Sequence, residues 1–114
     1  MRFLVKGEWV ETGAVLPAEQ FAPLIEHVVL PSLEQWDQWE QQGKSRGGVL
    51  AGQRAGVFLL EAESAEEVGQ LLTSLPFWGY IKWDVIPLQS VRSTIERERG
   101  VVAAMRGATQ PSGH

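Results

Sequence analysis

The chain begins with a segment in which hydrophobic and polar residues alternate. From Phe3 to Val10, every second residue falls on a mostly apolar side, and the residues between them form a mixed side that carries charges. This period of two predicts a β-strand with one face turned toward a core. The next residues, Glu11 to Leu16, are expected to form a loop.

A helical period follows the loop. From Ala18 to Gln42 the apolar residues recur every three or four positions, which predicts an amphipathic helix. The apolar stripe consists of Phe21, Leu24, Ile25, Val28, Leu33, Trp36 and Trp39. Pro31 lies inside this segment, where it cannot donate to the carbonyl of His27 and its ring presses on that residue. We therefore expect a kink or a break there.

Two short apolar runs around a glycine-containing turn predict a β-hairpin. Val49 to Ala51 and Val57 to Ala62 flank the segment Gly52 to Gly56. Its terminal glycines supply the positive φ angles that tight hairpins need. We expect Gly43 to Gly48 to end the preceding helix and to lead into the hairpin.

A capped helix and an aromatic strand come next. Ser64 to Glu67 (SAEE) form a capping box, and the apolar stripe behind it predicts a short helix that Pro76 terminates. Tyr80 to Ile86 predicts the last strand, which Pro87 closes.

The order of these elements, β-α-β-β-α-β, predicts an α+β fold of the split-βαβ, ferredoxin-like kind in residues 1–88. Ser90 to Met105 predicts an additional helix, so a single domain would span residues 1–106. Residues 107–114, which include His114, contain too little apolar material to order and should form a loose tail.

Composition narrows the class of partner. The chain of 114 residues has a net charge of −4 and scattered Lys and Arg residues, which argues against nucleic acid or an anionic membrane as a partner. It has no cysteine, which excludes disulfides, thiolate catalysis and cysteine-type zinc sites. The sequence begins without a signal-peptide pattern and contains no run of roughly 20 apolar residues, so we expect a cytoplasmic protein without a membrane span.

The sequence also resembles a known superfamily. The segment Gly47 to Leu88 (GGVLAGQRAGVFLLEAESAEEVGQLLTSLPFWGYIKWDVIPL) and the opening FLVK, Phe3 to Lys6, are similar to the dimeric α+β-barrel superfamily, in particular its muconolactone isomerase-like and YCII-like groups. The resemblance covers residues 1–88. It implies that two sheets pair face to face in a homodimer or a larger even oligomer, with the helices outside.

The resemblance implies a function as well. Muconolactone isomerase moves a proton on an unsaturated lactone without a metal or an organic cofactor. By this resemblance the chain would be a small, cofactor-independent enzyme that performs acid/base proton transfer on a small carbonyl or lactone compound. The alternative is a non-catalytic homodimer that binds a small molecule or another protein.

Four charged residues should meet on one face of the sheet. The first and last strands of this fold are antiparallel neighbours, and the residues concerned lie on the less apolar side of their strands. They are Lys6, Glu8, Lys82 and Asp84, here called the charged quartet. If Lys6 stands opposite Asp84, the period of two sets Glu8 opposite Lys82. Under a second sheet, the quartet could supply a carboxylate base and a lysine that stabilises an enolate; the alternative is a structural ladder of salt bridges.

Three other residues are candidates for the site. His27, the one histidine outside the tail, is either a general base beside the proline-disturbed turn or a surface residue, and one histidine makes no metal site. Trp78 and Tyr80 belong to a dense set of aromatic residues and are candidates for the rim of a substrate pocket or for a subunit contact. Trp36 and Trp83 are expected in the core.

Overall fold

The computed structural model describes residues 1–10 and 16–109. The predicted loop over 11–16 and the predicted tail over 107–114, with His114, lie largely outside these ranges. The elements in chain order are β1 (Arg2–Trp9), α1 (Ala18–Leu24), the π-helical turn η1 (Ile25–Val29), α2 (Leu30–Gln41), β2 (Ser45–Val49), β3 (Ala55–Glu61), α3 (Ala65–Thr73), the 3₁₀ turn η2 (Trp78–Tyr80), β4 (Ile81–Leu88) and α4 (Val91–Thr109).

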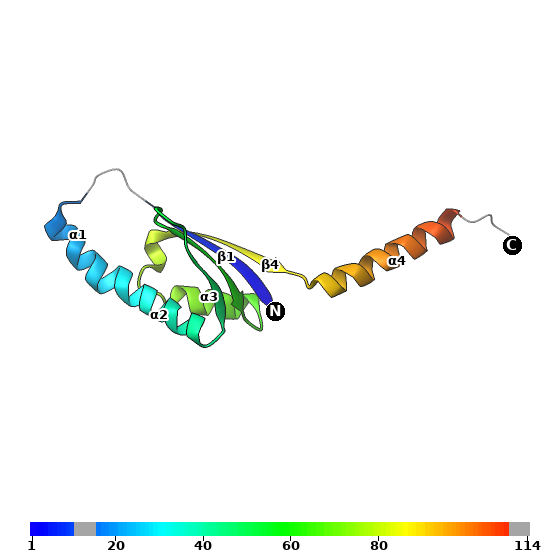
Figure 1. The fold of residues 1–114 in the computed structure, drawn as a ribbon, viewed down its shortest axis with the longest axis horizontal. Coiled ribbons are helices and arrows are strands. Elements are labelled where there is room, and N and C mark those ends of the chain that lie inside the picture. Colours follow the sequence, from blue (N-terminus) through cyan, green and yellow to red (C-terminus); the bar gives the residue numbers. More distant parts are fainter. Residues whose placement is uncertain (11–15, 110–114) are drawn as a thin grey trace.

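The strands form one antiparallel sheet in the order β2-β3-β1-β4, which confirms the ferredoxin-like α+β plan. The helices α1, α2 and α3 cover one face of this sheet (Figure 1). We call this the helix face and the other the open face. α4 extends away from the two layers as an arm (Figure 1), and the molecule measures 81 × 32 × 25 Å.

The core lies between the helix face and the helices. The sheet contributes alternate residues of its two central strands, because a period of two places them on one face. The buried residues are Phe3 and Val5 of β1, Phe58 and Leu60 of β3, Trp36 and Trp39 of α2, and Val68, Leu72 and Leu75 of α3 and its C-terminal end. Burying a large side chain contributes about 1.5–3 kcal/mol, so this cluster is the main source of stability.

The predicted register of the charged quartet is confirmed. β1 pairs with β4 so that Lys6 stands opposite Asp84 and Glu8 opposite Lys82. The apolar sides of both strands face the helices, since Val5 is opposite Val85 and lies in the core. A slip by one residue would carry the charges under the helices, where unpaired charge costs several kcal/mol.

The segment predicted as one helix from 18 to 42 is interrupted just before Pro31. Because Pro31 has no N–H, it cannot donate to the carbonyl of His27, and the turn Ile25–Val29 widens to a π-helix instead. The neighbouring Ser32 donates its hydroxyl to the carbonyl of Val28 (2.8 Å) and accepts the N–H of Phe77 (2.9 Å). The irregular turn is thus fixed to the loop before η2.

The bounds of two predicted strands were wrong. β2 is Ser45–Val49, not Val49 to Ala51, so it takes in residues predicted as the connection before the hairpin. Gly47 lets this strand approach β3 closely, because a Cβ at this position would overlap the backbone of Val57 and Phe58. β4 continues through Pro87 to Leu88, since an edge strand tolerates a proline that a central strand does not.

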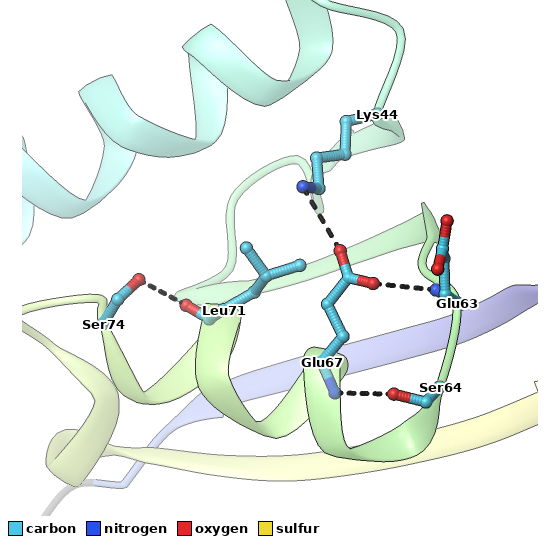
Figure 2. Close-up of polar contacts among 6 residues, drawn as sticks. All are labelled: Lys44, Glu63, Ser64, Glu67, Leu71 and Ser74. Carbon is cyan, nitrogen blue, oxygen red and sulfur yellow. Dashed lines mark hydrogen bonds and ion pairs between the residues drawn. The ribbon is translucent and has the colours of Figure 1, made fainter.

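The capping box is confirmed, and α3 begins where it was predicted. The hydroxyl of Ser64 accepts the N–H of Glu67 (3.1 Å), and the carboxylate of Glu67 accepts the N–H of Glu63 (2.9 Å), as Figure 2 shows. The ammonium of Lys44 lies 3.6 Å from the same carboxylate. These contacts lower the pKa of Glu67, chiefly through the hydrogen bond from Glu63.

α4 is longer than predicted and continues to Thr109 without a break at Gly100. All of its described side chains except that of Thr94 are exposed. In the part of the chain that the structure describes, no helix combines the length and hydropathy that crossing a membrane requires.

Candidate functional site

A pocket of about 350 Å³ opens between the helix face of the sheet and the segment α1-η1-α2. Its walls are mainly aromatic and aliphatic. The aromatic residues are Trp9, Phe21, Trp36, Phe58, Phe77 and Trp83. The volume and the apolar lining are typical of sites for small organic ligands.

The floor of the pocket is a pair of glycines. Gly7 of β1 stands opposite Gly56 of β3, and Trp83 of β4 flanks Gly7 on the other side. A Cβ on Gly56 would lie 2.8 Å from the ring of Trp36, and one on Gly7 would lie 3.0 Å from Trp83. The two glycines therefore let the rings of Trp36 and Trp83 lie close against the sheet at the floor of the pocket.

The opposite wall is supplied by helical residues. Phe21 of α1, Ile25 and Val29 of η1 and Leu33 of α2 all line the pocket. Two of these residues, Ile25 and Val29, belong to the π-helical turn, where the period of the helix changes. The interruption before Pro31 therefore helps to shape the wall.

Apart from the indole N–H groups of its tryptophans, the described lining has two polar side chains. They are Gln53 and Arg54, both exposed, in the turn between β2 and β3. The guanidinium carbon of Arg54 lies 5.0 Å from the centroid of the Phe21 ring, within the range of a cation–π contact. A positive charge thus lies beside an otherwise apolar pocket.

Tyr80 and Trp78 contact two residues of the pocket lining. The ring of Tyr80 stacks on Trp9 with a centroid distance of 5.1 Å and an interplanar angle of 2°. The indole N–H of Trp83 donates to the carbonyl of Trp78 (3.2 Å). Both residues are largely exposed, and each contacts a lining residue without lining the pocket itself.

The charged quartet lies on the open face, away from this pocket. Gly7 lies on the pocket floor, so its neighbours Lys6 and Glu8 point to the other side of the sheet. All four quartet side chains are exposed, and among the described residues none of them forms an ion pair. The structure brings the quartet together in register but not beside the pocket.

His27 is exposed on η1 and does not line the pocket, although its neighbours in the π turn do. The described residues contain no group of three or more His, Cys, Asp or Glu residues placed to hold a metal ion. The described residues of the pocket lining include no Asp, Glu, His, Lys or Tyr.

Sequence reasoning missed the glycine floor and Arg54. Gly7 interrupts the apolar side of its strand, which was a visible signal, but its meaning depends on Gly56 standing opposite it. The sequence places Arg54 in a hairpin turn and gives no sign of its contact with Phe21, because the two residues are far apart in the chain.

Comparison with solved structures supports the fold. A crystal structure of muconolactone isomerase at 3.3 Å resolution superposes with a TM-score of 0.62 at 22% identity, over 79% of this chain and 90% of that one. A 5-chloro-2-hydroxyhydroquinone dehydrochlorinase from Burkholderia phenoliruptrix AC1100, in complex with 2,5-dihydroxybenzoquinone, gives a TM-score of 0.53 at 17% identity, over 82% and 98% of the two chains.

No curated protein matches the chain in sequence. A family match is found nonetheless, and it covers residues 1–94, which include the whole sheet, the pocket and the first residues of α4. The chain therefore belongs to the muconolactone delta-isomerase family.

Proposed function

We propose that this protein is a small, cofactor-independent cytoplasmic enzyme that binds a flat, mainly apolar carbonyl or lactone compound and transfers a proton on it. The observation that carries the proposal is the aromatic pocket of about 350 Å³ above the Gly7–Gly56 pair. Membership of the muconolactone delta-isomerase family supports the type of reaction.

The pocket suits a ring-shaped ligand with an oxygen substituent. Its aromatic walls favour a flat apolar body, and the guanidinium of Arg54 at the rim favours a carbonyl or carboxylate oxygen. The quinone named in the dehydrochlorinase complex is a compound of this shape.

Two groups of residues are candidates for the proton-transfer step. The charged quartet supplies carboxylates and lysines, and it would act on a compound held between the open faces of two copies. His27 is the remaining candidate base, at the edge of the helical wall. For the pocket itself, the described lining supplies no carboxylate, histidine or lysine. This observation favours the second candidate function, a homodimer that binds its ligand without turnover.

The binding site can be tested with the pocket's own tryptophans. Trp9, Trp36 and Trp83 line the pocket, so 2,5-dihydroxybenzoquinone or muconolactone bound there should quench tryptophan fluorescence. Val29→Phe, which adds a ring to the pocket wall, should weaken binding at least tenfold. Glu26→Phe is the matched control, because Glu26 belongs to the same turn but is not among the lining residues. Equal affinity of the two variants would place the ligand elsewhere.

The chemistry can be tested with Asp84→Asn. Turnover of muconolactone is followed by ultraviolet absorbance, and unfolding by urea is measured in parallel. If the quartet is catalytic, this variant loses turnover and keeps its fold. If the quartet is structural, turnover persists and stability falls by about 1 kcal/mol or less. Binding to the wild type without any turnover would support the non-catalytic alternative.

A further inference from the structure

We propose that α1 is a lid on the pocket, that the π turn η1 is its hinge, and that the contact of Phe21 with Arg54 holds it closed. The inference rests on the proposed function, because it concerns how a ligand enters the pocket described above. It is carried by the position of Phe21 on the helix and by the way in which α1 is held.

The π turn determines on which side of the helix Phe21 lies. Phe21 and Leu33 both line the pocket and are twelve positions apart. An uninterrupted α-helix turns by about 100° per residue, so it would place these two side chains about 120° apart. In η1 the N–H of Leu30 donates to the carbonyl of Ile25, five residues back, so the turn holds one residue more than an α-helical turn. This additional residue reduces the angle to about 20°, and Phe21 faces the pocket.

Conversion of η1 to a regular α-helical turn would therefore move the lid. The N–H of Leu30 would donate to the carbonyl of Glu26 instead of Ile25, and α1 would rotate by about 100° relative to α2. Phe21 would then leave the pocket. The two forms of this turn thus correspond to a closed and an open pocket, and single π turns of this kind are frequent at functional sites.

α1 is a weak helix that contributes nothing to the core. It forms one end of the helix layer (Figure 1) and has seven residues, none of them buried. Pro17 at its N-cap provides no capping side chain, and Pro23 inside it has no N–H to donate to the carbonyl of Glu19. A helix this short depends on packing for its stability. Segments with so little burial open at a low cost in free energy, and binding-site lids are drawn from them.

The other side of the hinge is anchored. The hydroxyl of Ser32, which is fully buried, bonds to the carbonyl of Val28 in the π turn and to the N–H of Phe77. α2 also contributes Trp36 and Trp39 to the core. A rotation at η1 therefore moves α1 and leaves α2 on the sheet.

Phe21 and Arg54 join the lid to the sheet. The guanidinium carbon of Arg54 lies 5.0 Å from the centroid of the Phe21 ring. The backbone of Arg54 is fixed to the sheet, because its carbonyl accepts the N–H of Trp9 (2.9 Å). Arg54 is exposed and lines the pocket, so the contact closes the pocket where it meets solvent. A cation–π contact at an exposed site is weak, which allows the lid to open for a ligand.

Access to a buried cysteine tests the lid without any ligand. The chain has no cysteine, and Leu75 lines the pocket with only 3% of its surface exposed. Leu75→Cys is therefore the reporter, and its reaction with N-ethylmaleimide is followed by mass spectrometry. Pro31→Ala supplies the missing N–H and favours the α-helical turn, so it should speed this reaction at least tenfold. Phe21→Ala, which removes the ring that covers the pocket, should speed it as well.

Leu72→Cys is the matched control for unfolding. Leu72 is 4% exposed and belongs to α3, but it is not among the described lining residues. Its reaction should stay slow in the Pro31→Ala and Phe21→Ala backgrounds. Equal acceleration of Leu72→Cys and Leu75→Cys would indicate that the whole core opens, and it would overturn the proposal.

A deletion tests the hinge. Glu26 belongs to η1 and is not among the described lining residues, so its deletion removes the additional residue of the turn without removing part of the wall. Together with Pro31→Ala, this deletion allows a regular α-helix that again places Phe21 about 20° from Leu33. Leu75→Cys should then react as slowly as it does in the otherwise unchanged chain. A wild-type rate in Pro31→Ala alone, or no recovery on deletion of Glu26, would overturn the proposal.

Ligand release tests the contact that holds the lid closed. Stopped-flow tryptophan fluorescence measures the release of 2,5-dihydroxybenzoquinone. Phe21→Ala and Arg54→Met should each speed release at least threefold, and the double variant should be no faster than the faster single variant, because the two residues form one contact. Additive effects would overturn the role of this contact. If the wild type shows no quenching, the proposed function fails for this compound, and the cysteine reactions decide on the lid independently.

Discussion

At the scale of single residues, the neighbouring glycines 47 and 48 have different structural roles. Gly47 lies where β2 approaches β3, and its N–H donates to the carboxylate of Glu40 (2.7 Å). A Cβ there would overlap backbone atoms, which cannot move aside cheaply, whereas a Cβ on Gly48 meets nothing within 4 Å. The sequence shows two equivalent glycines, and only the strand pairing distinguishes them.

The expected result of substituting them follows from this difference. Gly47→Ala should lower the free energy of unfolding by about 3 kcal/mol, because the strands must separate to admit the methyl group. Gly48→Ala should change it by less than about 1 kcal/mol. Urea unfolding of the two variants measures both values. Similar losses for the two would contradict the close approach of β2 to β3.

The two buried serines form a second contrast. Ser32 connects α2 to the loop before η2, since its hydroxyl bonds to both Val28 and Phe77. Ser45 is equally buried, but its hydroxyl has no partner among the described residues. Ser32→Ala should therefore cost about 1–3 kcal/mol, because it leaves the N–H of Phe77 unpaired. Ser45→Ala should be neutral or stabilising. Urea unfolding of the two variants measures both values. An equal loss of stability for Ser45→Ala and Ser32→Ala would contradict this prediction.

At the scale of elements, the sequence predicted the features that depend on contacts between residues close together in the chain. The capping box of α3 was readable because Ser64 and Glu67 bond within one turn (Figure 2). The interruption before Pro31 was expected for the same reason, although its π-helical form was not. The first strand of the hairpin was predicted at Val49 to Ala51 and lies at Ser45–Val49, because glycine is rare in strands and its use here depends on β3, which follows later in the chain.

The pH dependence of the α3 cap provides a prediction at this scale. The hydrogen bond from Glu63 lowers the pKa of Glu67 below the usual glutamate value of 4.5. A carboxylate with a lowered pKa in the folded state contributes stability above pH 4.5, and this contribution is lost as the pH falls through the lowered value. Glu67→Gln should therefore flatten the loss of stability below pH 4.5.

Urea unfolding between pH 2 and pH 7 measures this slope. Glu66→Gln is the control, because it removes a carboxylate from the same turn of α3, whereas the hydrogen bond from the N–H of Glu63 and the ion pair with Lys44 both belong to Glu67. If Glu66→Gln flattens the loss of stability at low pH as much as Glu67→Gln does, the α3 cap is not the cause of that loss.

At the scale of the whole molecule, the pocket floor and the open face both depend on which residues the paired strands place opposite each other. Gly7 and Gly56, at the floor of the pocket, stand opposite each other although they are far apart in the sequence. The same register aligns Leu59, Leu4 and Ile86 in one row across three strands of the open face. Next to this row lie Val57, Lys6 and Asp84. The open face thus has an apolar row with charged residues on both sides of it, Arg2 and Glu61 on one side and the charged quartet on the other, which suits a face that a second sheet covers.

We expect this face to pair with that of a second copy, as the resemblance to dimeric α+β barrels implied. The mass of the full chain from light scattering should be twice 12.6 kDa or a larger even multiple of it. Adding Leu4→Glu should lower this mass, because the new carboxylate would be buried unpaired in the row of Leu59 and Ile86. Gln70→Glu on the exposed side of α3 is the control and should leave the dimer intact. A monomeric mass before Leu4→Glu is added would refute pairing through the open face, and the charged quartet would then have no second sheet under which to act as a base.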